Sequence, residues 1–555
     1  MGAGRDPTAP LALGLIIVVL CLLAAGCWRV YSNTWDEPEH LAAGVELLDR
    51  GRYEYDTEHP PLARLALALP PYLAGAHSFG TRPPEGTPEG IDILYSGGHY
   101  WLYLTLARLG ALPFLALLLF VTWLWGRRVL KSTPAALLCV LLLGSVPPVL
   151  GHGALASLDV AAAATILLAL YALERWVESA KLRDAVGAGL ATGVAVVTKF
   201  SAVPFLGLGQ PALMLAHASH RRPPAAALRM RFGGFALIAL AALVPVLLLY
   251  GPRAPDPAGV ALRFNWAVSY LLERSGFDHA VGVLLAHLPL PRELQDFVNG
   301  IVAVKAHNDS GHLSYLLGRV SLSGWWYFYL VALAVKTPIP LLIAGPCGMV
   351  WLAHEGWVRR DSWALAPLVL ALTILGFAST FSHINIGIRH VLILYPFFAL
   401  GGAYLVLRGA RALTRLADRR LALAGAGALA AFLTWQLSPL WSAFPDYLPY
   451  FNEMVSHPER VLVDSDLDWG QDLHRLELRA AQLEIPKLNL AYRGTANLAK
   501  EPLPPLVILP PRRPVTGWVA VSALARTRNP ADYAWLDAYR PIERVGKTID
   551  LYFVP

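Results

Sequence analysis

The residues best suited to chemistry lie in one acidic stretch, Tyr31–Arg64, directly after the first apolar segment. It holds eight of the nine acidic residues in the first 64 positions, including the pair Asp36-Glu37 and Glu58 next to His59. Ionisable groups held against a bilayer are costly and mark functional sites by default. An ionised aspartate at a water–lipid boundary can act as a general base, and a glutamate beside a histidine can hold a divalent cation.

Two short amphipathic helices are predicted to position these acids along the bilayer surface. Pro38 stands at a first helical position, and apolar residues follow it at helical spacing. Pro60-Pro61 begins a second segment of the same kind. Both acidic groups therefore precede a helix N-terminus, whose partial positive charge favours ionised carboxylates. The alternative is that Asp36 and Glu58 only cap surface helices.

The composition is that of a polytopic α-helical membrane protein. Of the 555 residues, 55% are hydrophobic and 15% are charged, which is too apolar for a soluble protein of this length. Apolar windows of about 20 residues recur, the length that crosses a hydrocarbon core. About eleven transmembrane helices are predicted, at residues 10–28, 99–125, 134–150, 159–177, 184–199, 201–218, 232–250, 325–353, 363–381, 389–407 and 421–440.

The distribution of basic residues orients these spans. The formal net charge is +7, and the arginines and lysines cluster in short loops between the predicted spans. With eleven spans, all of these loops lie on the same side of the membrane. Such loops face the cytoplasm, so the N-terminus is predicted inside and the C-terminus outside. Cytoplasmic loops thus account for the positive net charge, and no nucleic-acid partner is predicted. The long loops 29–98 and 251–324 then lie on the outer face.

Beyond the membrane part, 1–440, the tail 441–555 is more polar and alternates strand-like runs with one helical stretch. This pattern predicts a small extracytoplasmic α/β domain. The tail contains the sequence DSDLDWGQD at 464–472, whose first acids are spaced as in a calcium-binding loop. Trp469 stands where that loop requires glycine, and Arg475 stands where it requires glutamate. The sequence therefore favours a strand end that leads into a helix.

The acidic stretch resembles the first external loop of the family-39 glycosyltransferases. The shared pattern is W-D-E-P, about twenty residues, and then E-H-P-P-L-A-R. The family's relatives include protein O-mannosyltransferases and lipid A aminoarabinose transferases, membrane enzymes of the C-type superfamily, and the spans of 1–440 resemble theirs. The resemblance implies that Asp36 is the catalytic base, that Glu37 is a helper, and that Glu58 binds a metal ion or lies near the donor. The identity of that divalent cation is open.

Three further positions fit the same family frame, and two more are candidates because they are ionisable groups at membrane depth. Asp159, at the outer mouth of the fourth span, is expected to assist catalysis, and its alternative role is that of a helix N-cap. Lys199 is expected to pair with a lipid phosphate, as in similar enzymes, and its alternative is a lysine that snorkels to the interface. His59 matches the histidine of the O-mannosyltransferases. Lys336 and Arg389 lie at membrane depth and, like His59, are candidates for donor-phosphate contact.

The predicted function follows from the predicted location in a bacterial inner membrane. Nucleotide sugars are not supplied outside the cytoplasm, so the donor must already lie among the membrane lipids. We therefore expect transfer of a sugar from polyprenyl phosphate to an acceptor hydroxyl, with inversion. The acceptor (protein, lipid or glycan) is left open. A phosphate leaves as an anion, so one carboxylate suffices where a glycosidase uses two.

Two alternatives to this function remain open from the sequence. The first is a transporter or flippase for lipid-linked sugars, which would place ionisable groups near the bilayer midplane. The second is a glycan ligase of the same fold, whose tail would grip a polymer. The strongest acidic cluster lies at the predicted outer interface, which favours an enzyme over a transporter. His307, His312 and His383 are expected to be loop or interface histidines rather than ligands.

Overall fold

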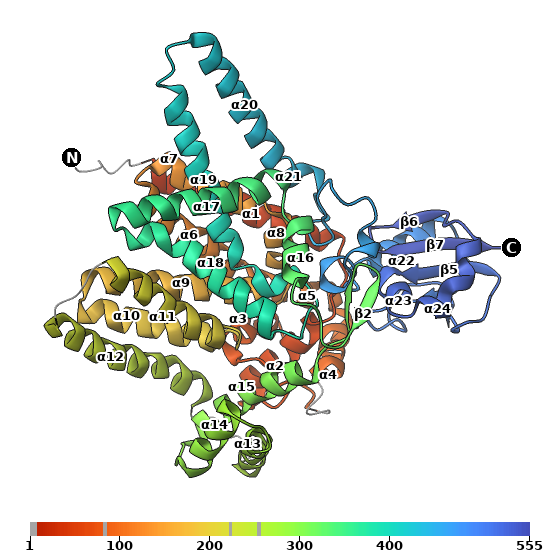
Figure 1. The fold of residues 1–555 in the computed structure, drawn as a ribbon. Coiled ribbons are helices and arrows are strands. Elements are labelled where there is room, and N and C mark those ends of the chain that lie inside the picture. Colours follow the sequence, from red (N-terminus) through yellow and green to blue (C-terminus); the bar gives the residue numbers. More distant parts are fainter. Residues whose placement is uncertain (1–7, 81–85, 221–224, 252–256) are drawn as a thin grey trace.

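The computed structural model describes residues 8–80, 86–220, 225–251 and 257–555. A bundle of apolar helices forms the body, and a small sheet stands beside it and carries the C-terminus (Figure 1). The helices of the body are α1 (Ala9–Gly26), α5 (Tyr100–Leu109), α6 (Leu112–Leu130), α7 (Thr133–Gly144), α8 (Pro147–Gly153), α9 (Asp159–Ser179), α10 (Leu182–Val196), α11 (Ala202–His220), α12 (Ala225–Tyr250), α16 (Phe328–Lys336), α17 (Ile339–Arg359), α18 (Ser362–Phe381), α19 (Leu394–Leu413) and α20 (Arg419–Leu437).

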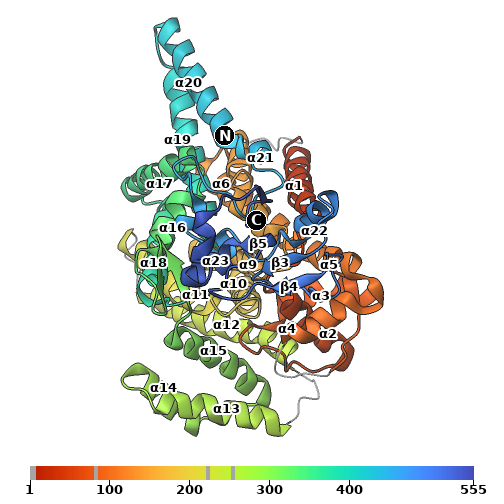
Figure 2. The same ribbon diagram turned by 90° about the vertical axis from the view of Figure 1, so that its right-hand side faces the viewer.

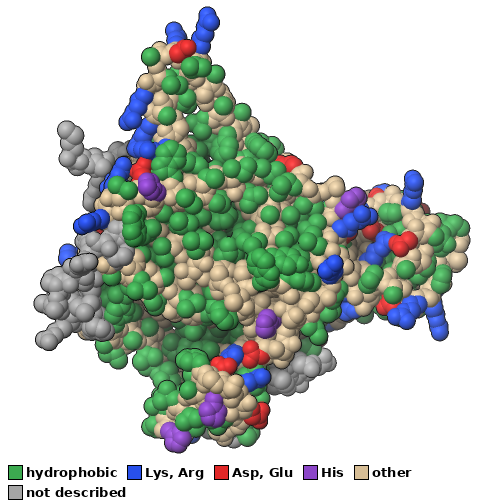
Figure 3. Space-filling view, viewed as in Figure 1, with side chains coloured by type: hydrophobic (Ala, Val, Ile, Leu, Met, Phe, Trp, Pro, Cys, Tyr) green, Lys and Arg blue, Asp and Glu red, His purple; other side chains and the backbone are tan. Residues whose placement is uncertain are grey.

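The described helices support a polytopic membrane protein. Six of the helical segments are long and apolar enough to cross a membrane, and a seventh is added if α7 and α8, bent by 70°, form one span. The predicted count of eleven stays a prediction. Hydrophobic side chains cover the visible face of the body, whereas charged side chains gather on the sheet and at the two ends (Figure 3). The predicted segment 325–353 is broken between α16 and α17, where Thr337 and Pro338 are not helical.

The acidic stretch folds into helices at one end of the body. Its helices are α2 (Glu37–Arg50) and α3 (Pro61–Leu73), and α4 (Gly86–Tyr95) follows them. The prediction of two helices after Asp36 and after Pro60 is confirmed. Glycines allow these helices to pack closely, since a Cβ at Gly44 would lie 2.3 Å from the carbonyl oxygen of Arg64 in α3. The α2–α3 pair is therefore rigid, and it fixes the residues just before each helix.

A second group of helices lies at the same end of the body in both ribbon views (Figures 1 and 2). It consists of α13 (Pro257–Leu272), α14 (Phe277–His287) and α15 (Arg292–Ser310). A short antiparallel hairpin follows, with β1 (Ser314–Leu316) and β2 (Arg319–Ser321). These elements bring the second long loop next to the acidic stretch.

The C-terminal part forms a five-stranded mixed sheet in the order β4-β3-β5-β7-β6. Strand β3 is parallel to β4 and β5, and β7 is antiparallel to β5 and β6. Helices cover the sheet and bury apolar clusters against it. The elements are α22 (Leu473–Gln482), β3 (Leu488–Ala491), β4 (Leu506–Ile508), β5 (Gly517–Ser522), α23 (Ala523–Arg528), α24 (Pro530–Tyr533), β6 (Glu543–Val545) and β7 (Ile549–Val554).

The residues between the last body helix and the sheet pack with the helices. Tyr447, Leu448, Leu462 and Trp469 lie in the same apolar core as the body, whereas the core under the sheet begins with Leu473. Val463 and Leu467 already pack with Leu524 of α23, so this segment contacts both parts, and the domain boundary predicted at residue 441 stays a prediction. This placement puts the aspartate-rich sequence at 464–472 between the two parts.

Candidate functional site

Four of the predicted site residues meet in one ion-pair cluster. Arg389 NH1 lies 2.5 Å from Asp36 Oδ2 and 3.6 Å from Asp159 Oδ2. Lys199 Nζ lies 2.5 Å from Asp159 Oδ1. The cluster holds two cations and two carboxylates, so it is neutral when all four are charged. We call these residues the central cluster.

Four different elements supply the central cluster. Asp36 precedes α2, and Asp159 is the first residue of α9. Lys199 lies in the turn between α10 and α11, and Arg389 lies on the short helix η3 (Ile388–Val391). The packing of the helix ends therefore brings the four residues together. The spacing of these residues along the sequence does not predict this contact.

The capping alternatives are not supported by this geometry. Asp36 occupies the N-cap position of α2, but its side chain makes no capping hydrogen bond. Asp159 is already helical, and Leu158 takes the N-cap position of α9. Lys199 does not reach away from the protein, because Asp159 binds its ammonium group. All three side chains instead serve the ion-pair cluster.

A pocket opens between α9, α11 and η3 at the central cluster. Its polar end is formed by Asp159, Lys199, Arg389 and His390. The rest of its wall is apolar and is formed by Ala162, Ala163, Ile166, Phe205, Leu392 and Ile393, together with the small polar Ser201. The Arg389 side chain is 7% exposed, and its Nε–H finds no hydrogen-bond partner among the described residues. The pocket thus offers a buried polar end with two cations, one carboxylate and an unused N–H donor, and an apolar continuation.

A second polar cluster lies around Glu58. Glu58 Oε2 is 2.8 Å from His307 Nδ1, and His307 Nε2 is 3.4 Å from His312 Nδ1. The hydrogen bond with Glu58 raises the pKa of His307 against the opposing effect of burial. His307 thus joins α15 to the acidic stretch, which agrees with the expectation of a loop or interface histidine. Sequence reasoning could not find this contact, since 249 positions separate the two residues.

His59 lies next to this second cluster but has a different partner. Its Nδ1 is 3.1 Å from Asp56 Oδ2, and the buried Arg64 binds the same carboxylate. The backbone N–H of Leu62 donates to Val197 O at 3.0 Å, close to Lys199 in sequence. This bond ties the start of α3 to the end of α10, and His59 itself does not line the pocket at the central cluster.

The donors around Glu58, the predicted metal ligand, are the imidazoles of His307 and His312. One carboxylate and two imidazoles are chemically suitable for a divalent metal such as zinc. Both ring nitrogens of His307 are used in a linear chain of hydrogen bonds, however, and do not converge with Glu58 on one point. Across the described ranges no group of three His, Cys, Asp or Glu side chains is arranged to hold a metal ion. The present arrangement of these side chains does not fit a resident metal.

Glu37 does not face the pocket. Its carboxylate is buried and accepts from Arg108 Nε and NH2, both at 2.8 Å, from Thr34 N at 2.7 Å and from Ala156 N at 2.8 Å. Arg108 also donates to the carbonyl oxygens of Tyr31 and Ser32. Glu37 therefore builds the loop that carries Asp36, and its expected role as a helper in the chemistry becomes a structural one.

Lys336 does not line the pocket at the central cluster either. Its Nζ donates to Leu448 O at 2.9 Å and to Asp466 O at 2.6 Å, and it lies 4.4 Å from the ring centroid of Phe451. The side chain is enclosed between α16 and the chain that leads to the sheet. The prediction that Lys336 contacts the donor phosphate is therefore corrected, because carbonyl oxygens already take up its hydrogen bonds.

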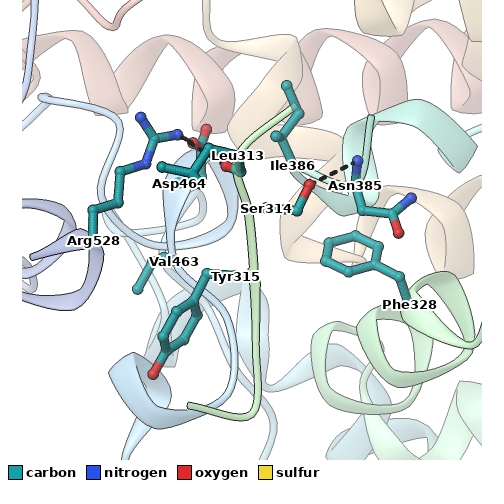
Figure 4. Close-up of a pocket in the computed structure, with 9 residues that line it drawn as sticks. All are labelled: Leu313, Ser314, Tyr315, Phe328, Asn385, Ile386, Val463, Asp464 and Arg528. Carbon is teal, nitrogen blue, oxygen red and sulfur yellow. Dashed lines mark hydrogen bonds and ion pairs between the residues drawn. The ribbon is translucent and has the colours of Figure 1, made fainter. Parts of the chain in front are cut away.

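A second pocket lies between the hairpin, α16 and the start of the aspartate-rich sequence (Figure 4). Arg528 NH2 binds Asp464 Oδ2 at 2.7 Å on one side of it, and the N–H of Asn385 donates to Ser314 Oγ at 3.2 Å on the other. None of the residues predicted from the sequence lines this pocket. It joins the sheet to the body and is separate from the central cluster.

Comparisons with known proteins were made on the sequence and on the fold. The family model described as dolichyl-phosphate-mannose-protein mannosyltransferase matches residues 104–249. The comparison with curated protein sequences gives no match. The S. cerevisiae protein O-mannosyltransferase Pmt1–Pmt2 complex bound to the sugar donor has a TM-score of 0.50 at 11% identity, with 80% of this chain and 90% of that chain covered.

Two further solved structures show weaker similarity. ArnT from Cupriavidus metallidurans, bound to undecaprenyl phosphate, has a TM-score of 0.47 at 15% identity, with 98% of each chain covered. The oligosaccharyltransferase AglB from Archaeoglobus fulgidus has a TM-score of 0.41 at 13% identity, with 79% of this chain and 56% of that chain covered. The family model agrees with the family resemblance seen in the sequence, although it matches residues 104–249 and not the acidic stretch, and most of the chain shares the fold of the Pmt1–Pmt2 complex.

Proposed function

We propose that the protein is a membrane glycosyltransferase that moves a sugar from a polyprenyl phosphate to an acceptor hydroxyl on the extracytoplasmic face. The observation that carries this proposal is the pocket at the central cluster, with Lys199 and Arg389 at one end and an apolar wall beyond them. A polyprenyl phosphate has the same two parts, an anionic head and an apolar tail. The Pmt1–Pmt2 complex, which shares the fold, was solved with its sugar donor bound.

The two cations suit a phosphate that becomes a leaving group. A guanidinium presents several N–H donors in one plane and binds phosphate oxygens in pairs, while an ammonium supplies a compact charge. The free Nε–H of Arg389 is a donor that a phosphate oxygen can use. Negative charge on the phosphate grows as the bond to the sugar breaks, so fixed cations stabilise the transition state more than the ground state.

Asp36 is the proposed base. Arg389 binds its Oδ2, and no described residue donates to Oδ1, so that oxygen can accept the proton of an acceptor hydroxyl. The acceptor oxygen attacks the anomeric carbon from the side opposite the phosphate, the bond to the phosphate breaks, and polyprenyl phosphate leaves as an anion. A donor phosphate competes with Asp36 for Arg389. Its binding therefore loosens the ion pair and makes the Asp36 carboxylate a better proton acceptor.

The function is tested with purified protein in nanodiscs and a panel of labelled polyprenyl-phosphate monosaccharides. We expect one of these donors to be converted to free polyprenyl phosphate when membranes or extracts that contain acceptors are added. A flippase would instead move the donor across proteoliposome bilayers without breaking it. A ligase would transfer only whole lipid-linked glycans. Either of these results, with no monosaccharide transferred, would refute the proposal.

Lys199→Gln is expected to weaken use of the donor. Loss of one charge-assisted hydrogen bond to the phosphate corresponds to about 1.5–3 kcal/mol, so kcat/KM for the donor should fall about 10- to 100-fold. Lys305→Gln provides a matched control, because Lys305 is a half-buried lysine in α15 that pairs with Asp278 and Asp309. Initial rates over a range of donor concentrations measure both variants. Equal rates for the two would remove Lys199 from the phosphate site.

Glu39 is expected to make donor binding depend on pH. Burial, and then the nearby charge of Asp56, raise the pKa of Glu39 to about 7, with Arg64 opposing them. The carboxyl is neutral below this pH, and above it adds a negative charge close to Asp36 and Glu58. The KM for an anionic donor should therefore rise about threefold between pH 6 and pH 8. In Glu39→Gln this rise should disappear, and a KM rise identical to that of the wild type would contradict the assignment.

A further inference from the structure

The aspartate-rich segment, residues 464–472, runs between the helical body and the C-terminal sheet. Its carboxylates bind main-chain N–H groups of elements far apart in the sequence. Asp466 Oδ1 accepts from Ile388 N at 3.0 Å, and Asp468 Oδ2 accepts from Leu524 N at 2.7 Å. A calcium loop would need its carboxylates to converge on one ion. These carboxylates diverge, and they tie η3 of the body to α23 of the sheet.

The backbone of the same segment binds the loop that carries Asp36. Trp35 N donates to Trp469 O at 3.1 Å, and Ser32 N donates to Gln471 O at 2.9 Å. The first of these bonds is made by the residue directly before Asp36. The aspartate-rich segment therefore contacts the central cluster from two sides, through η3 and through the acidic stretch.

The Trp469 side chain reaches the central ion pair itself. Trp469 is 2% exposed, and its ring lies against Arg389, whose Cζ is 4.4 Å from the ring centroid. Arg389 donates from NH1 to Asp36 Oδ2 at 2.5 Å. A guanidinium stacked on an indole is attracted to its face, and more strongly where water is excluded. The ring thus limits the directions in which the guanidinium of Arg389 can point.

We propose that Trp469 is a positioning residue that holds the Arg389 guanidinium where it can bind the leaving phosphate beside Asp36. This inference rests on the proposed function and gives the chain beyond the last body helix a role in it. The chemistry stays with Asp36 and Arg389, and Trp469 acts through Arg389. Without the flat ring, the guanidinium would leave its aligned position for part of the time, so the phosphate would bind more weakly and fewer donors would react.

The test compares Trp469→Leu and Trp469→Phe with a control, Trp518→Leu, in the full-length protein. Trp518 is a half-buried residue of β5 that packs against Phe553 within the sheet. We expect kcat/KM for the donor to fall about 30-fold in Trp469→Leu, the loss that corresponds to a desolvated cation–π contact. Trp469→Phe keeps a flat aromatic face and should remain within about threefold of the wild type, as should Trp518→Leu.

A double-mutant cycle with Arg389→Lys separates positioning from folding. Lysine offers a compact charge that gains less from a flat support. If Trp469 acts through Arg389, adding Trp469→Leu to Arg389→Lys should lower kcat/KM by less than about threefold, because coupled residues are not additive. A further fall of about 30-fold in the double variant, or equal losses in Trp469→Leu and Trp518→Leu, would overturn the proposal.

Failure of the proposed function gives a different result. In that case the wild-type protein itself releases no polyprenyl phosphate from any of the labelled donors. The positioning role is then decided by binding of decaprenyl phosphate alone to the purified protein in detergent. Weaker binding to Trp469→Leu with unchanged binding to Trp518→Leu supports the role, and equal binding to all three proteins refutes it.

Discussion

Asp36→Asn is expected to lower sugar transfer by about 10²–10⁴-fold, the usual contribution of a general base. Asparagine has the shape of aspartate and keeps an oxygen that can accept the hydrogen bond from Arg389. It cannot take up the proton of an acceptor hydroxyl. The loss should therefore appear in kcat, while binding of the donor changes little or becomes tighter, because Arg389 no longer has a charged competitor for the phosphate. Release of polyprenyl phosphate and binding of decaprenyl phosphate measure these two effects separately.

Asp49→Asn is the matched control for Asp36→Asn. Asp49 lies near the end of α2, and its carboxylate accepts from Ser78 N at 3.0 Å, so it belongs to the same helix but not to the central cluster. Its substitution should leave the transfer rate within about threefold of the wild type, as for most surface changes. A rate above a tenth of the wild-type rate in Asp36→Asn, with normal protein yield, would exclude Asp36 as the base.

The local part of this site could be predicted from the sequence because local chemistry determines it. Pro38 and Gly51 bound α2 through proline at the start of the helix and a left-handed glycine at its end. Pro60-Pro61 begins α3 in the same way. Long apolar runs likewise predicted where body helices lie, because the bilayer requires a minimum length.

The partners of each ionisable group could not be predicted, because helix rotation and long-range packing determine them. Lys336 and Arg389 looked equivalent as ionisable groups at membrane depth. Arg389 faces Asp36 across 353 positions of sequence, whereas Lys336 faces carbonyl oxygens of the segment before the sheet. For the same reason the contact of Trp469 with Arg389 could not be predicted. In the sequence, Trp469 only stands where a calcium-binding loop requires glycine. Its role depends on Arg389, a residue with no sequence relation to it.

Arg108→Met is expected to destabilise the folded protein by about 3–5 kcal/mol, the usual cost of leaving one partner of a buried ion pair uncompensated. Arg108 and Glu37 are each 1% exposed and are joined by two hydrogen bonds of 2.8 Å. Burial opposes ionisation of Glu37, but the charge of Arg108 outweighs it and lowers the pKa of this carboxyl. The pair therefore stabilises the wild type above the ordinary glutamate pKa, and this stabilisation is lost as the pH falls through the lowered pKa.

Thermal unfolding of the purified protein in detergent measures this effect, with Arg359→Ala as the control. Arg359 pairs with Glu355 at 3.1 Å on the surface of α17, and an exposed pair of this kind contributes about 0–1 kcal/mol. Glu37→Leu added to Arg108→Met should recover part of the lost stability, because it removes the unpaired buried charge. Recovered stability with little recovered transfer is the expected result, since the loop before Asp36 would still lack the hydrogen bonds that fix it. Full recovery of transfer in the double variant would show that the Glu37–Arg108 pair does not position Asp36.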